Sequence, residues 1–191
     1  MFFECQNYDL YYYQEDKPLM IMVPGAADTI NPVEEYIKDG IVSPEYNIAF
    51  FRRDKAWAKI DPEEIKKAIN CMPRTEVYYC GFSLGAWDFY RYKDLADFTK
   101  VILIDGYCTD FWEKESISEL YVVQSYENYI WQYEALEYLM PECDIQIFDM
   151  TDWGDHVGSY WVTFAPDEEA FYRYRKNAMK GQCLNLLEVI K

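Results

Sequence analysis

The sequence predicts an α/β fold with three layers, in which a mainly parallel sheet of about seven or eight strands lies between two layers of helices. Short apolar runs alternate along the 191 residues with segments that carry helix-starting residues. Some runs, such as residues 19–23 (LMIMV), are apolar throughout, which is typical of strands buried on both faces. Strands joined by a helical crossover run parallel, because the helix carries the chain back to the end of the sheet at which the first strand began. Such crossovers are right-handed.

The strands are predicted from apolar and aromatic runs bounded by turn residues. The first two are aromatic and β-prone, and we expect them to form a hairpin or an antiparallel edge of the sheet. The predicted strands are residues 2–6, 9–14, 19–23, 46–51, 76–80, 101–104, 120–123 and 145–148.

The helices are predicted from their starting residues. Asn31-Pro32 and Asp61-Pro62 each place a capping side chain before a proline, and a glutamate follows at the third position or next to it. The first predicted helix begins at residue 31. The other predicted helices span residues 61–70, 84–98, 130–140 and 167–180. No linker or repeat interrupts the pattern, so residues 1–191 are expected to form a single domain.

Composition excludes several classes of function. The formal net charge is −16, and such a surface repels nucleic-acid phosphates and anionic lipids. No C-x-x-C pair or zinc-finger spacing occurs among the six cysteines, which we interpret as reduced. The first residues resemble no signal peptide, and no apolar run approaches the ~20 residues of a membrane span. We therefore expect a cytoplasmic protein that binds neither nucleic acid nor membrane. Its oligomeric state is not predicted.

One motif carries chemistry. Gly81-Phe82-Ser83-Leu84-Gly85 follows a predicted strand and precedes a predicted helix. A serine at such a sharp turn needs glycines two residues before and after it, because other backbone passes close by. In this motif and in its element order the chain resembles the α/β-hydrolase superfamily, in a minimal form. The resemblance implies that Ser83 is a nucleophile on a strained turn.

The resemblance also implies a general base. The sequence has one histidine, His156, in a predicted glycine-flanked loop after the last predicted strand and before the final predicted helix. Members of the superfamily place the catalytic histidine there. His156 would take the proton of Ser83 during attack and return it to the leaving group.

The acid that orients the histidine is less clear from the sequence. The family most often carries it just after the penultimate strand. By spacing, Asn128 stands there where an aspartate is usual, and Glu127 lies beside it. We favour Glu127. The alternatives are Asp105, which ends the preceding strand, and Asn128, which would orient the ring without charge.

Two backbone N–H groups are expected to form the oxyanion hole. One is that of Leu84, directly after the nucleophile. The other is that of Ala26, because Pro24-Gly25-Ala26 stands where relatives often read His-Gly-x. The histidine-to-proline change leaves this backbone donor in place.

The substrate is expected to be a small acyl compound. Only about 14 residues separate Asp105 from the next strand, which leaves no room for a cap domain. The nearby segments are aromatic, which favours an apolar or aromatic substrate. They are Phe111-Trp112, Tyr129-Ile130-Trp131, Trp153 and Tyr160-Trp161.

The sequence therefore predicts a serine-dependent hydrolase of carboxylic esters or thioesters that works through an acyl-enzyme and needs no cofactor or metal. Two alternatives remain at this point. One is a hydrolase-like binding module without turnover, which the Asn128 departure suggests. The other is an acyltransferase that uses the same triad.

Overall fold

The computed structural model describes residues 2–4, 8–11, 14–26, 31–42, 45–71, 74–108, 114–134, 136–152, 156–174 and 183–190. The strands within these ranges are β1 (Phe2–Glu4), β2 (Tyr8–Tyr11), β3 (Leu19–Val23), β4 (Asn47–Phe51), β5 (Val77–Phe82), β6 (Phe98–Ile104), β7 (Glu119–Gln124) and β8 (Asp144–Asp149). They form one sheet in the order β1-β2-β4-β3-β5-β6-β7-β8. β1 and β2 pair antiparallel, as does β2 with β4, and all pairs from β4 to β8 are parallel.

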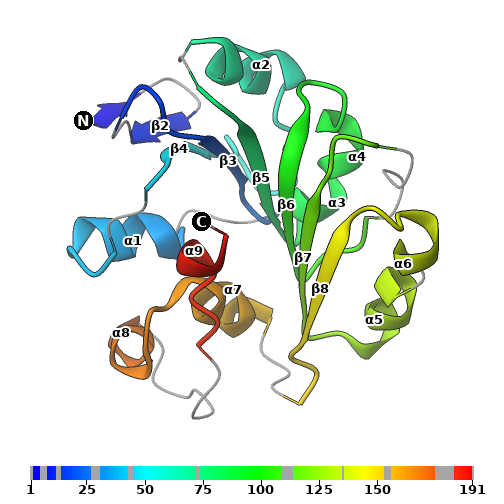
Figure 1. The fold of residues 1–191 in the computed structure, drawn as a ribbon. Helices are drawn as coiled ribbons and strands as arrows, with labels where there is room; N and C mark the ends of the chain where they lie inside the picture. The colour runs from blue at the N-terminus through cyan, green and yellow to red at the C-terminus, as the bar shows by residue number, and fades with distance from the viewer. Residues whose placement is uncertain are drawn as a thin grey trace.

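Helices cover both faces of this sheet (Figure 1). Those of the described ranges are α1 (Pro32–Lys38), α2 (Pro62–Asn70), α3 (Leu84–Trp87), α4 (Phe89–Tyr92), α5 (Glu127–Glu134), α6 (Leu136–Leu139), α7 (His156–Phe164), α8 (Glu168–Tyr174) and α9 (Leu186–Val189). Side chains from α2 to α6 pack into one core, and side chains from α1, α7, α8 and α9 pack into the other. The predicted three-layer α/β fold with a mainly parallel sheet is confirmed.

Strand β3 shows how the sequence builds two cores at once. Leu19, Ile21 and Val23 enter the core on the α2 side, whereas Met20 and Met22 enter the core on the α1 side. Successive side chains of a strand point to opposite faces, so a strand covered on both sides has to be apolar at every position. The prediction that residues 19–23 are buried on both faces is confirmed.

The two helix starts predicted from capping residues, at Asn31 and Asp61, are also confirmed. The side chain of Asn31 accepts a hydrogen bond from the backbone N–H of Val33 at 3.0 Å. That of Asp61 accepts one from the N–H of Glu63, also at 3.0 Å. Each cap satisfies a donor that the first turn of the helix leaves unpaired.

Two predicted helices are wrong in extent. The predicted helix over 130–140 begins earlier, at Glu127, as α5. The predicted helix over 84–98 is two short helices, α3 and α4, and Phe98 is already the first residue of β6. The Phe98 ring is buried and makes edge contacts with Tyr79 and Phe89, both at 5.7 Å between ring centroids. This packing of the Phe98 ring favours a strand at residue 98, where the sequence predicted the end of a helix. The predicted helix over 167–180 is observed as α8, and residues 175–180 lie outside the described ranges.

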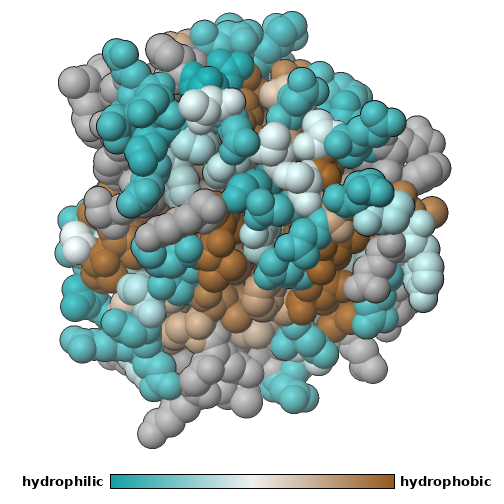
Figure 2. All heavy atoms as spheres, in the orientation of Figure 1, coloured by the Kyte–Doolittle hydropathy of each residue, from teal (hydrophilic) through white to brown (hydrophobic). Residues whose placement is uncertain are grey.

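Hydrophilic residues cover much of the face shown in Figure 2, with hydrophobic residues visible between them. No helix in the described part of the chain has the length and hydrophobicity needed to cross a membrane. The cysteines at 71, 80, 108, 143 and 183 form no disulfide in the described part of the chain, and burial raises the pKa of the Cys183 thiol to about 11.

Glycines allow α3 to approach the end of β3 closely. A Cβ placed on Gly85 would lie 2.1 Å from the carbonyl oxygen of Val23 and 2.9 Å from that of Pro24. A Cβ on Gly81 would lie 2.6 Å from the carbonyl oxygen of Gly85. The prediction that these two positions need glycine because other backbone passes close by is confirmed.

We expect Gly85→Ala to lower the free energy of unfolding by about 3 kcal/mol, because the added methyl group overlaps backbone that cannot move independently. Gly40→Ala is the matched control. Its φ is +68° but no atom lies within 4 Å of the added Cβ, so only the left-handed backbone contributes, at ~1 kcal/mol. Urea unfolding followed by tryptophan fluorescence measures both values. Equal losses in the two variants would contradict the close approach.

Candidate active site

Backbone strain is concentrated at one place in the described part of the molecule. Among the described residues, four that are not glycine have a positive φ: Trp57 at 64°, Ser83 at 53°, Asp105 at 47° and Asn185 at 47°. The first three line a single cavity of about 240 Å³. Each such conformation costs about 1–3 kcal/mol and tends to occur at functional sites. This cavity is therefore the candidate active site.

Ser83 occupies the turn between β5 and α3, as predicted. Its φ and ψ are 53° and −114°. Its backbone N–H donates to the carbonyl oxygen of Ile104 in the neighbouring strand at 2.8 Å. Gly106 lies directly beneath, since a Cβ there would be 2.4 Å from the carbonyl oxygen of Ser83. Contacts with the adjacent strand end therefore hold the serine in a conformation that it would not adopt alone.

Asp105 follows β6, the strand next to β5, and its side chain is 0% exposed. Its Oδ1 accepts from the backbone N–H of Ser125 at 2.6 Å, and its Oδ2 accepts from the Ser125 hydroxyl at 2.8 Å. The hydroxyl of Ser159 donates to the same Oδ2. A buried carboxylate needs such donors to replace water, and here they also fix its orientation.

His156 meets this carboxylate. Its Nδ1 lies 3.1 Å from Oδ2 of Asp105. The imidazole stacks on Phe82, with ring centroids 4.8 Å apart, and Tyr126 lies beside it at 5.6 Å. His156 and Ser83 line the same cavity. The structure thus brings together the two residues that the sequence analysis paired across 73 positions of chain.

The local setting of His156 differs from the prediction. We expected a loop, but His156 is the first residue of α7, a helix that the sequence analysis did not predict. In α7 the side chain of Ser159, three residues later, lies on the same face as His156 and donates to the same Asp105 oxygen. The i, i+3 spacing of His156 and Ser159 was the signal that could have revealed this helix.

The three candidate acids differ in what the structure shows. Asp105, an alternative in the sequence analysis, is the carboxylate beside the imidazole. Glu127, the favoured candidate, and Asn128 begin α5, and their side chains lie outside the described part of the structure. Ser125, which donates to Asp105, was not predicted as a site residue. It directly follows β7, and the end of β7 lies beside the end of β6.

The two segments that carry the expected oxyanion donors both lie close to Ser83. Leu84 is the first residue of α3 and lines the cavity. Ala26 follows Gly25 in the loop after β3, and a Cβ on Gly25 would lie 3.3 Å from the Cβ of Ser83. The segment after β3 therefore passes against the serine.

Aromatic side chains form the rim of the cavity. Trp57, Trp87 and Tyr126 line it, and each is exposed, Trp57 to 73%. Two of the aromatic residues that we expected near the substrate, Tyr160 and Trp161, are instead buried in the core beneath α7. The other expected ones, Phe111, Trp112, Tyr129, Trp131 and Trp153, fall on residues or side chains outside the described part.

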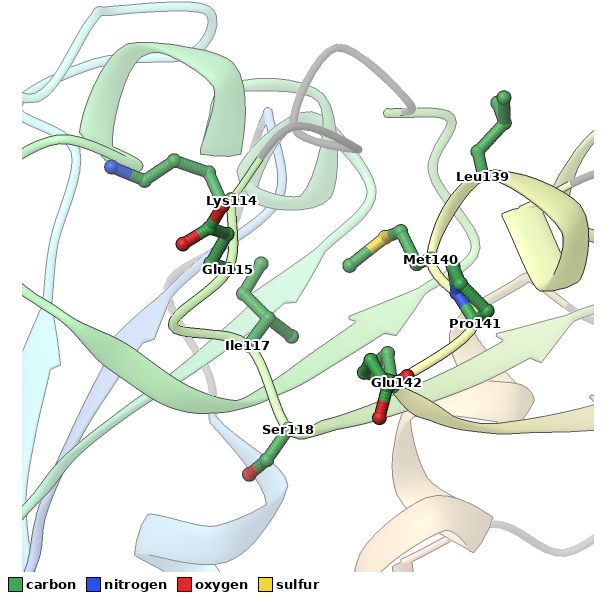
Figure 3. A pocket seen from close by; sticks show the side chains of 9 residues that line it. Lys114, Glu115, Ile117, Ser118, Leu139, Met140, Pro141 and Glu142 are labelled. Atoms are coloured by element: carbon green, nitrogen blue, oxygen red, sulfur yellow. The ribbon is translucent and has the colours of Figure 1, made fainter.

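A larger cavity, of about 650 Å³, lies at the opposite end of the sheet, where β7 and β8 begin. In Figure 3 the side chains of Ile117 and Met140 point into it from opposite sides. Ligands of parallel sheets bind outside the carboxyl ends of the strands. The smaller cavity lies at that end, and its residues carry the chemistry. Among the described residues, no group of three or more His, Cys, Asp or Glu could hold a metal ion.

Comparisons with known proteins support the fold. No family model matches the sequence, and a comparison with curated proteins finds no significant match. Alpha/beta hydrolase domain-containing protein 10 from mouse is 13% identical, with a TM-score of 0.54 over 100% of this chain and 96% of that one. A dienelactone hydrolase-like promiscuous phosphotriesterase from metagenomic libraries is 11% identical, with a TM-score of 0.54 over 75% of this chain and 74% of that one.

A third similar structure is acyl-protein thioesterase 2 from Zea mays, which is 10% identical, with a TM-score of 0.51 over 74% of this chain and 89% of that one. The chain has an α/β-hydrolase fold. The structural similarity to these proteins establishes the fold. At identities of 10–13% it establishes no activity.

The single histidine makes the side-chain arrangement directly testable. We expect the neutral imidazole to carry its proton on Nδ1, because Nδ1 faces the carboxylate of Asp105. ¹⁵N NMR of the one imidazole reports the tautomer. Asp105→Asn should change the nitrogen shifts, whereas Glu127→Gln should leave them as they are. A proton on Nε2, or a response to the Glu127 variant alone, would contradict this assignment.

Proposed function

We propose that the protein is a serine hydrolase that cleaves carboxylic esters or thioesters, with Ser83 as nucleophile, His156 as general base and Asp105 in place of Glu127 as the orienting acid. The observation that carries the proposal is the His156–Asp105 contact of 3.1 Å beside a serine held at positive φ. A serine is a weak nucleophile unless a neighbouring base takes its proton, and the base in turn needs an orienting group.

The reaction proceeds in two halves. Ser83 Oγ attacks the acyl carbon as Nε2 of His156 takes the hydroxyl proton, and the negative charge moves to the carbonyl oxygen. The N–H groups of Leu84 and Ala26 stabilise this oxyanion. The carbon–oxygen or carbon–sulfur bond then breaks, and His156 gives its proton to the leaving alcohol or thiol. Water, activated by the same imidazole, releases the acid from Ser83.

The substrate that fits the rim carries an apolar or aromatic acyl group. Trp57, Trp87 and Tyr126 offer ring faces next to the nucleophile, and such faces bind planar or aliphatic groups. The cavity of about 240 Å³ admits a small group in full, and a larger one extends across the exposed rings. The similarity to an acyl-protein thioesterase is consistent with this substrate class.

The proposal is favoured over a binding module without turnover. Asn128 in place of an aspartate suggested such a module, but Asp105 supplies a carboxylate at the imidazole, so the Asn128 departure no longer removes the acid. Transfer of the acyl group to an alcohol or amine instead of water uses the same residues, and product analysis with competing acceptors distinguishes the two outcomes.

A fluorophosphonate probe tests the nucleophile. We expect it to modify the wild-type protein at Ser83, because the activated hydroxyl displaces the fluoride, and mass spectrometry of peptides locates the adduct. Ser83→Ala and His156→Ala should abolish labelling.

Ser118→Ala is the matched control for that experiment. Ser118 lines the larger cavity at the opposite end of the sheet, so its loss should leave labelling unchanged. Labelling that persists in Ser83→Ala, or a wild-type protein that stays unmodified, would refute the serine hydrolase.

The rim makes a separate prediction about acyl preference. Trp57→Ala should lower kcat/KM for p-nitrophenyl benzoate or hexanoate about 5- to 10-fold, the magnitude of a lost aromatic contact, and should leave the acetate unaffected. Tyr138→Ala, which removes an exposed aromatic residue from α6, is the control and should change neither. Equal losses for all esters would show that Trp57 does not contact the acyl group.

A further inference from the structure

One buried arginine connects the parts of the site that the mechanism needs in fixed positions. The side chain of Arg53, which follows β4, is 1% exposed. Its Nη2 lies 3.0 Å from Oδ2 of Asp88, at the end of α3, and is also 3.0 Å from the carbonyl oxygen of Pro24. Its Nη1 donates to the carbonyl oxygen of Ala58. A single guanidinium thus links three chain segments around the cavity.

The contact that matters most for chemistry is with Gly25. Nε of Arg53 donates to the carbonyl oxygen of Gly25 at 2.8 Å. This carbonyl and the N–H of Ala26 belong to the same peptide unit, which is planar and trans, so the two bonds point in opposite directions. When Arg53 holds the Gly25 oxygen, it also sets the direction of the Ala26 N–H. A cation bound to the carbonyl polarises the peptide and strengthens its N–H as a donor.

The same arginine reaches the second donor through Asp88. The backbone N–H of Asp88 donates to the carbonyl oxygen of Leu84 at 2.8 Å, which closes the turn of α3. Arg53 binds the side chain of Asp88, so a displacement of α3 relative to the loop after β3 would break a buried ion pair. Separating such a pair is strongly unfavourable, because it leaves an uncompensated buried charge.

We propose that Arg53 is a positioning residue for the oxyanion hole, in that it orients the Ala26 N–H through the Gly25 carbonyl and fixes it relative to Leu84 through Asp88. This inference rests on the proposed function. Arg53 touches neither the nucleophile nor the base, and it acts on catalysis through two backbone groups. It also fastens the loop that carries the exposed Trp57, whose N–H donates to the carbonyl oxygen of Ala26 at 2.7 Å.

The experiment compares Arg53→Met and Arg53→Lys with Arg91→Met. Arg91, on α4, approaches the other oxygen of Asp88, with Nη1 3.7 Å from Oδ1, so its variant removes a cation from the same carboxylate. Arg53→Lys keeps the charge but has one ammonium group in place of the guanidinium fork, and this group cannot hold three segments together.

We expect Arg53→Met to lower kcat about 100-fold with little change in KM, because losing one oxyanion donor weakens binding of the transition state and not of the substrate. Inhibition by an alkylboronic acid, whose tetrahedral adduct on Ser83 mimics that state, should weaken in parallel. Arg53→Lys should show the same pattern to a smaller extent, and Arg91→Met should retain wild-type values.

Amide hydrogen exchange provides a readout that does not depend on activity. Exchange in the peptide that contains residues 24–26 should be faster in both Arg53 variants and unchanged in Arg91→Met. If the wild-type protein resists the fluorophosphonate, the proposed function fails, and exchange still tests whether Arg53 holds the loop.

Three outcomes would overturn the proposal. The first is a kcat for Arg53→Met equal to that of Arg91→Met, or a loss confined to KM. The second is unchanged exchange in residues 24–26. The third is global unfolding of both Arg53 variants under conditions where Arg91→Met stays folded, since Arg53 would then stabilise the whole fold and not this site.

Discussion

The structure depends on the close approach of three backbone segments at Ser83. Gly85 rests against the carbonyl of Val23, Gly81 against Gly85, and Gly106 against Ser83 itself. No side chain fits between these segments. The sheet, the turn at Ser83 and α3 therefore pack directly against one another. This packing holds Ser83 at a φ that costs free energy, and the cost is offset by the burial of the strands on either side.

The parallel sheet then determines which other residues can reach the serine. β6 lies next to β5, and Asp105 therefore emerges beside Ser83. β7 lies next to β6 and delivers Ser125 to the far side of the same carboxylate. α7 crosses the carboxyl end and supplies His156 and Ser159 together. Groups far apart in the chain converge because parallel strands bring their ends to one edge.

Two buried charges serve different purposes at this edge. Asp105 is surrounded by donors from Ser125, Ser159 and His156, and these contacts leave the carboxylate a single orientation. Arg53 is surrounded by acceptors, three of which are backbone carbonyls. A buried ion that binds backbone carbonyls acts on the course of the chain itself. That is why Arg53, and not a residue closer to the nucleophile, is our candidate for control of the oxyanion hole.

Local chemistry was sufficient to predict much of this protein. The alternation of buried strands and helices, the caps at Asn31 and Asp61, and the glycines around Ser83 all act over a few residues of backbone, so the sequence displays them. The orienting acid was not predictable in this way. Glu127 and Asp105 both follow strands, and only the packing of β6 against α7 shows that Asp105 faces the imidazole. The contacts of Arg53 were not predictable for the same reason. Its partners at Gly25, Ala58 and Asp88 come together only when β3, β4 and α3 pack against one another.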